Sequence, residues 1–74
     1  MNNIGDNDMI NIVDNVLKKV VSVLEVNTSG LTITEIVHKT KLGRSAVRTA
    51  LANLDGANKV SIKKIGMAKV YSIK

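Results

Sequence analysis

Both arginines of the chain, Arg44 and Arg48, stand four residues apart, whereas the other nine basic residues are lysines. A guanidinium is a planar fork that can pair with guanine O6 and N7 together, and lysine is a point charge better suited to phosphate. Hydroxyl and amide side chains can bond base edges, and an alanine can contact a thymine methyl. The residues predicted to read bases are Arg44, Ser45, Ala46, Arg48, Thr49 and Asn53. The alternative is an ordinary solvated helix face.

A second group of polar residues suits the phosphate backbone by charge and position. Three lysines flank the tripeptide at 66–68, two more lie near residue 40, and two threonines begin the stretch before them. The predicted backbone contacts are Thr32, Thr34, Lys39, Lys41, Lys63, Lys64 and Lys69. Helix capping explains the threonines equally well. Lysines at 63, 64 and 69 could also protect an edge strand from aggregation, and both roles are compatible.

The distribution of charge supports a polyanionic partner. The chain has 74 residues, a net charge of +5 and an isoelectric point near 9.8. Residues 1–27 hold four acids against two lysines, a balance of −2. Residues 28–74 hold nine basic residues against two acids, a balance of +7. The basic part is therefore the part that carries the predicted contacts, as expected of a protein that binds double-stranded DNA.

Other classes of function find little support. Without cysteine there is no disulfide or thiolate metal site, and His38 is the single histidine. Six scattered acids form no catalytic or metal-binding set, so we expect no enzyme, no cofactor and no metal. In so small a core we expect no small-molecule pocket. Charged residues interrupt the one long apolar stretch, and the amino terminus is acidic, so we expect no membrane segment and a cytoplasmic protein.

Residues 8–27 have the periodicity of a helix. Apolar residues recur at spacings of three and four from Ile10 to Leu24, which forms a heptad seam. A strand is a local alternative for the valine-rich end, but strict alternation fails over the full span. The apolar arc is wider than one core-facing stripe requires. We therefore predict a homodimer through Met9, Ile12, Val16 and Val23. The alternative is that the protein's own core covers these side chains.

Two shorter helices are expected within residues 31–57. Thr32 and Glu35 have the spacing of a capping box at the start of the first. The residues predicted to face inward are Ile33, Ile36, Val37, Val47, Ala50, Leu51 and Leu54. A turn at 41–43 separates the two helices, and the second begins near Arg44. Gly56 gives a glycine C-cap signal at its end.

The period changes in residues 59–74. Two β-branched runs flank a Gly-Met-Ala tripeptide, which predicts a hairpin with a three-residue loop at 66–68. Tyr71 is the one aromatic residue. We expect it to pack the hairpin against the core, with base stacking as the less favoured role.

The order and spacing of these elements resemble the winged helix-turn-helix family. The family run S-E-L-A-x-x-T-G-L-S-x-S-T-V-x-x-x-L-x-x-L is similar to this chain from Thr34 to Leu54. Two positions depart from it. Lys41 stands in place of the turn glycine, so either it adopts a left-handed conformation or the turn differs. Gly43 stands in place of the usual serine or threonine N-cap, which glycine can replace at small cost.

The resemblance implies an α+β fold: a single winged-helix domain over residues 1–74, with three helices followed by a two-stranded β-hairpin wing. It implies a sequence-specific regulator of transcription that binds double-stranded DNA. The alternatives are a DNA-architectural protein of low specificity and a protein-interaction module that binds no DNA. The small size, without an appended sensor domain, is similar to regulators of archaea and of their viruses and plasmids.

Overall fold

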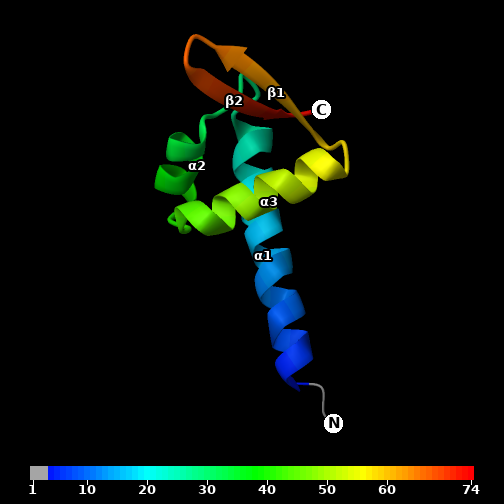
Figure 1. Cartoon of the computed structure of the whole chain (residues 1–74). Coiled ribbons are helices and arrows are strands. Elements are labelled where there is room, and N and C mark those ends of the chain that lie inside the picture. The colour runs from blue at the N-terminus through cyan, green and yellow to red at the C-terminus, as the bar shows by residue number, and fades with distance from the viewer. Residues whose placement is uncertain (1–3) are drawn as a thin grey trace.

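Three helices and a hairpin make up the part of the chain that the structure describes. The computed structural model describes the backbone of residues 4–74 and the side chains of residues 14–74. The elements are α1 (Ile4–Val26), α2 (Ile33–Thr40), α3 (Arg44–Gly56), β1 (Val60–Ile65) and β2 (Ala68–Ile73) (Figure 1). The expected α+β order, with a two-stranded antiparallel hairpin after the third helix, is confirmed.

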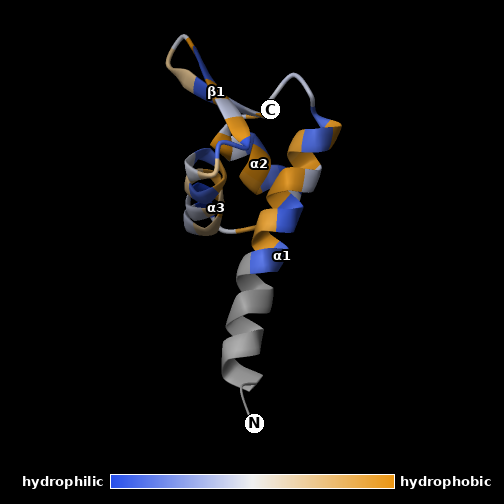
Figure 2. Cartoon of the chain, turned by 90° about the vertical axis from the view of Figure 1, so that its right-hand side faces the viewer, coloured by the Kyte–Doolittle hydropathy of each residue, from blue (hydrophilic) through white to orange (hydrophobic). Residues whose placement is uncertain are grey.

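The first helix is longer than the sequence predicts. It begins at Ile4, four residues before the expected start at residue 8, and it includes the valine-rich segment for which a strand was the alternative. Gly5 does not prevent this start, because one glycine costs a helix only about 1 kcal/mol. Hydrophobic and hydrophilic bands alternate along the part of α1 beside α2 and α3 (Figure 2). The amino-terminal half of α1 extends away from the other elements, and the molecule measures 50 × 24 × 20 Å (Figure 1).

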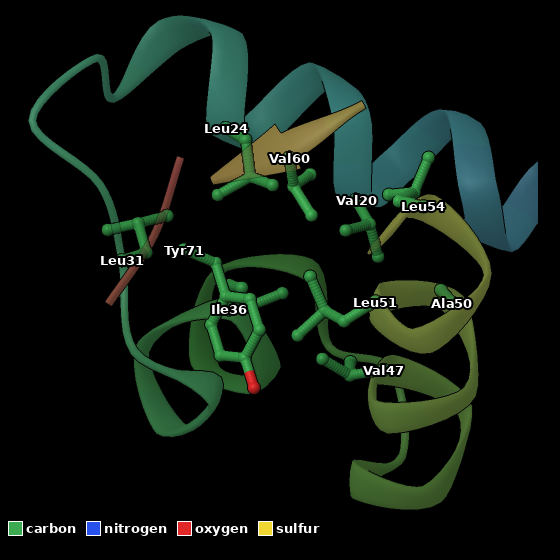
Figure 3. Close-up of a cluster of buried hydrophobic side chains, with 10 residues drawn as sticks. All are labelled: Val20, Leu24, Leu31, Ile36, Val47, Ala50, Leu51, Leu54, Val60 and Tyr71. Atoms are coloured by element: carbon green, nitrogen blue, oxygen red, sulfur yellow. The ribbon is translucent and has the colours of Figure 1, made fainter. Parts of the chain in front are cut away.

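The core lies where the carboxyl-terminal half of α1 meets α2, α3 and the hairpin. Side chains from all of these elements point toward one another there (Figure 3). The buried residues are Val20, Leu24, Leu31, Ile36, Val47, Ala50, Leu51, Leu54, Val60 and Tyr71. The four inward positions predicted for α3 are therefore confirmed, as is the packing of Tyr71. Each large aliphatic side chain contributes roughly 1.5–3 kcal/mol by leaving water.

A short bridge ties the start of α2 to the wing. Leu31 pairs with Tyr71 through two backbone hydrogen bonds, N–H to O, of 2.9 Å and 2.8 Å. Gly30 precedes this bridge at φ 98°, and a Cβ on it would lie 2.5 Å from Val70 Cγ1 and 3.0 Å from the Tyr71 carbonyl oxygen. Only glycine fits such a close approach without a shift. The predicted capping box then starts α2: the Thr32 hydroxyl accepts from the Glu35 amide at 3.2 Å, and Glu35 Oε1 accepts from the Thr32 amide at 2.9 Å.

The wing loop is shorter than predicted. Ile65 pairs with Ala68, so the loop has two residues, Gly66 and Met67, and the expectation of a three-residue loop was wrong. Gly66 has φ 61°, a positive value at the first loop position, where type II′ hairpin turns take glycine. A type II′ turn needs a positive φ only at its first loop residue. Two loop residues therefore suffice, and Ala68 pairs with Ile65.

The end of α3 also differs from the prediction. Gly56 is the last residue of the helix and does not adopt the left-handed conformation expected of a glycine C-cap. Asn58 does, at φ 61°. The Asn58 amide donates to the Asp55 carbonyl at 2.9 Å, and the Lys59 amide donates to the Leu54 carbonyl at 2.8 Å. These two bonds form a Schellman motif with asparagine at its left-handed position.

Candidate nucleic-acid interface

The turn between α2 and α3 sets the direction of the predicted recognition helix. Lys41 has φ 63° and ψ 17°, so the left-handed alternative is the correct one, and its amide donates to the Val37 carbonyl at 2.9 Å. The Thr40 hydroxyl donates to the Ile36 carbonyl at 2.7 Å and accepts from the Leu42 amide at 3.3 Å. Gly43 is the N-cap of α3 and, as expected of glycine, supplies no side-chain cap bond. These bonds compensate for the left-handed lysine.

The exposed side of α3 is divided between two grooves. One groove lies between α3 and the wing, and its lining includes Arg48, Ala52 and Asp55 of the helix. The other lies between α3 and α1, and its lining includes Ser45, Thr49 and Asn53. The predicted base-reading residues on this exposed side thus line two different grooves. Arg48 belongs to the wing side, and the small polar residues belong to the α1 side.

The groove between α3 and the wing brings together charge of both signs. Lys69 of β2 lines it opposite Arg48, and Ile62, Met67 and Tyr71 of the wing add apolar surface. Lys64 pairs directly with Lys69 across the hairpin, so both lysines project from the same face of the sheet as Tyr71. Sequence reasoning missed the contribution of Ile62 and Asp55 to this groove. The hairpin register, which depends on the loop length, would have located Ile62.

The third wing lysine lies apart from the other two. Lys63 pairs with Val70 and projects from the opposite face of the hairpin, because successive residues of a strand alternate between faces. All three wing lysines are exposed. Lys39 is also separate: it lines a groove between α1 and α2 together with Lys18 and Lys19.

The amino termini of α2 and α3 meet through Arg44, a predicted base-reading residue, and Thr34, a predicted backbone contact. Arg44 Nη2 donates to the Thr34 hydroxyl at 3.2 Å, and both side chains are exposed. This bond uses one of the five guanidinium donors of Arg44. Thr32, by contrast, is half-buried and has its hydroxyl engaged in the helix cap. Arg44 and Thr34 thus present donors together at one edge of α3, beside the exposed Lys41.

The groove between α1 and α3 is mainly apolar. Val16 and Leu17 of α1 line it together with Ala46 and Ala50 of α3, and its volume is about 280 Å³. Val16 and Val23, two of the four predicted dimer contacts, are half-buried and pack against the core of their own chain. Met9 and Ile12 lie outside the side chains that the structure describes. The core therefore uses part of the predicted dimer face.

In the region that the structure covers, no helix is long and apolar enough to cross a membrane. No group of three or more histidine, cysteine, aspartate or glutamate side chains could hold a metal ion in that same region.

A comparison with known protein families finds a match over much of the helical part of the chain. The family model described as the RNA polymerase III subunit RPC82 helix-turn-helix domain matches residues 11–56. That span runs from within α1 to the last residue of α3 and leaves the wing outside. No curated protein matches the chain.

Proposed function

The chain belongs to the family of the RNA polymerase III subunit RPC82 helix-turn-helix domain, and from this premise we propose that it is a sequence-specific DNA-binding regulator of transcription. In this proposal it acts as a repressor-like homodimer in the cytoplasm. The observation that carries the proposal is the groove in which Arg48 of α3 and Lys69 of the wing lie together. Positive charge on both the recognition helix and the wing suits binding to double-stranded DNA, where the helix enters the major groove and the wing lies beside it.

In this proposal, α3 and the wing contact different parts of the DNA. Arg48 pairs with a guanine edge in the major groove, and Lys64 and Lys69 contact phosphates beside it. Asp55 lines the same groove and would repel a phosphate, so the part of the groove beside Asp55 favours base edges over backbone. Arg44, Thr34 and Lys41 hold the backbone at the other end of α3. This division supports sequence-specific binding over purely electrostatic binding.

Dimerisation through α1 supplies a second recognition helix, which can bind a second half-site on the DNA. The projecting half of α1 carries Met9 and Ile12 in its sequence and lies clear of the backbone of the other elements (Figure 1). In this dimer each recognition helix would enter one of two half-sites about 34 Å, one turn of duplex, apart. One small domain alone makes few contacts, so pairing raises both affinity and specificity.

Selection from a random duplex pool, followed by titration at several salt concentrations, tests the proposal. We expect the selected duplex to bind on the order of 10³ times more tightly than a scrambled duplex. The affinity should fall steeply as salt rises, because bound phosphates release counterions. A ratio near one would favour the architectural alternative instead.

The family match favours one alternative of another class. The reference protein of the family is described as a subunit of RNA polymerase III, so a helix-turn-helix of this family can be part of a protein assembly. A protein-interaction module would show no measurable duplex affinity even at low salt, and that result would refute DNA binding. The +7 balance of residues 28–74 supports DNA.

A further inference from the structure

The tip of the wing combines two exposed apolar side chains with a pair of lysines. Met67 is 99% exposed and Ile65 is 59% exposed. Single exposed apolar residues are ordinary in soluble proteins. Here, however, Met67 stands in the loop at the end of a hairpin, one residue pair beyond the Lys64–Lys69 pair. The tip therefore has an apolar side chain at its end, and two positive charges follow a short distance along the hairpin.

The Lys64–Lys69 pair places two positive charges directly opposite each other in the hairpin. Two like charges directly opposite each other destabilise a hairpin. Within the described side chains the ion pair is Lys18 with Asp14, so neither wing lysine has a carboxylate within ion-pair distance. Phosphates on both sides of a narrow groove would relieve this repulsion. A protein partner that bound the tip would instead have to cover two charges, and charged residues are depleted at the centre of protein interfaces.

The position of Met67 favours the minor groove. Met67 and Lys69 line the same groove as Arg48 and Ala52 of α3, so the tip and the recognition helix face the same side. With α3 in a major groove, the tip reaches over the phosphates toward the adjacent minor groove. Methionine is unbranched and adaptable, and it is among the side chains that proteins insert between base pairs.

We propose that Met67 is a wedge that enters the minor groove and partly unstacks one base step, while Lys64 and Lys69 hold the phosphates on either side. The duplex then kinks toward the major groove, around α3. This inference rests on the DNA binding proposed above and adds a bend to it. Pyrimidine–purine steps unstack most easily, so the wing selects a TA or CA step without hydrogen-bonding to it.

Two optical measurements on the full-length chain test the wedge. Energy transfer between dyes at the two ends of the selected duplex reports bending, and 2-aminopurine moved one base at a time reports unstacking. Binding is followed in the same samples by anisotropy. The variants are Met67→Ala and the conservative Met67→Leu. Val26→Ala is the matched control, because Val26 is an apolar residue 82% exposed on α1.

For the wild type we expect increased energy transfer and a several-fold rise in 2-aminopurine fluorescence at one step. Met67→Ala should lose both signals while its affinity falls by no more than about tenfold, and Met67→Leu and Val26→Ala should keep both. Replacing the responsive step by AA should weaken wild-type binding by about fivefold and leave Met67→Ala nearly unchanged. Tight binding without a bend, or a bend that survives in Met67→Ala, would overturn the wedge but not the DNA-binding function. A chain that binds no duplex at low salt would overturn both.

Discussion

Single residues at the interface have different roles because they come from different elements. Arg48 lies in the groove of α3 and the wing, where a planar fork can meet a base edge. Lys64 lies on the wing, where a point charge meets a phosphate. These roles predict that substitutions at the two positions fail in different ways.

We expect Arg48→Ala to cost about 1–3 kcal/mol on the selected duplex and much less on a scrambled one, so that sequence preference relaxes. Lys64→Ala should weaken every duplex about equally and reduce the slope of log affinity against log salt by about one. Lys63→Ala is the matched control, since Lys63 is also exposed but projects from the other face of the hairpin. Anisotropy titrations of all three variants at several salt concentrations provide the measurement. Equal losses for Arg48→Ala on both duplexes would contradict base reading.

Lys41 combines a conformational cost with a proposed contact. Its left-handed backbone costs a side-chain-bearing residue roughly 1 kcal/mol relative to glycine. Lys41→Gly should therefore stabilise the fold by about that amount, which raises the melting temperature of so small a domain by roughly 4–8 °C. If Lys41 contacts phosphate, the same variant should bind DNA more weakly at every salt concentration. Lys39→Ala is a useful comparison, because Lys39 is exposed on α2 in an ordinary helical conformation. A Lys41→Gly protein that is both more stable and unchanged in affinity would exclude the contact.

At the scale of elements, sequence patterns predicted the buried side of each short helix. Val47, Leu51 and Ile36 follow helical spacing, and burial requires little beyond that spacing. Turns were less predictable, because several residue types can supply one left-handed position. Asn58 took the place expected for Gly56, and a single glycine at 66 allowed Ala68 to pair. The shorter loop then decided which wing lysines share a face.

The site was predicted as a set of residues but not as an arrangement. Residue type alone selected Arg48, Lys64 and Lys69, which the fold does bring to one side. Sequence could not separate Lys63 and Lys39 from them, because that depends on the hairpin register and on how α1 packs against α2. Nor could it show that the helix flank with Ala46 lines an apolar groove beside Val16.

The bridge between Leu31 and Tyr71 predicts an unequal response to two glycine substitutions. Gly30→Ala places a Cβ against Val70 and the Tyr71 carbonyl at a positive φ, so we expect a loss of about 2 kcal/mol or more. Gly56→Ala is the control, because it lies in the last turn of α3 with no atom within 4 Å of the added Cβ. That variant should gain about 0.5–1 kcal/mol from its higher helix propensity. Chemical denaturation of both variants provides the comparison, and a Gly30→Ala protein as stable as the wild type would show that the bridge tolerates a shift.

At the scale of the whole molecule, charge and shape are separated along the chain. Residues 1–27 carry a balance of −2 and include the long helix α1, and residues 28–74 carry +7 and include α2, α3 and the wing with the proposed interface. A negative projecting helix is poorly suited to lie on DNA. It is better suited to hold two basic domains together at a distance from the duplex, which agrees with the proposed homodimer.

The packing of α1 determines which residue should be substituted to test this homodimer. Val16 contacts the core of its own chain, so a charge there would disturb folding as well as association. Met9 is a sharper position, because by its number it belongs to the amino-terminal half of α1, whose backbone extends away from the other elements (Figure 1). Met9→Glu should give a folded monomer in a sizing experiment, and Asn15→Glu, on the exposed polar side of the same helix, should remain a dimer.

The monomeric variant should also lose the dependence on half-site spacing. A wild-type dimer should bind two half-sites about one helical turn apart far more tightly than one, and five inserted base pairs should abolish that advantage by turning one half-site to the opposite side of the duplex. Met9→Glu should bind both duplexes with the affinity of a single half-site, because its domains engage DNA independently. A wild-type protein that is monomeric at micromolar concentration and insensitive to spacing would refute the dimer. The role of α1 would then be to complete the core of its own chain.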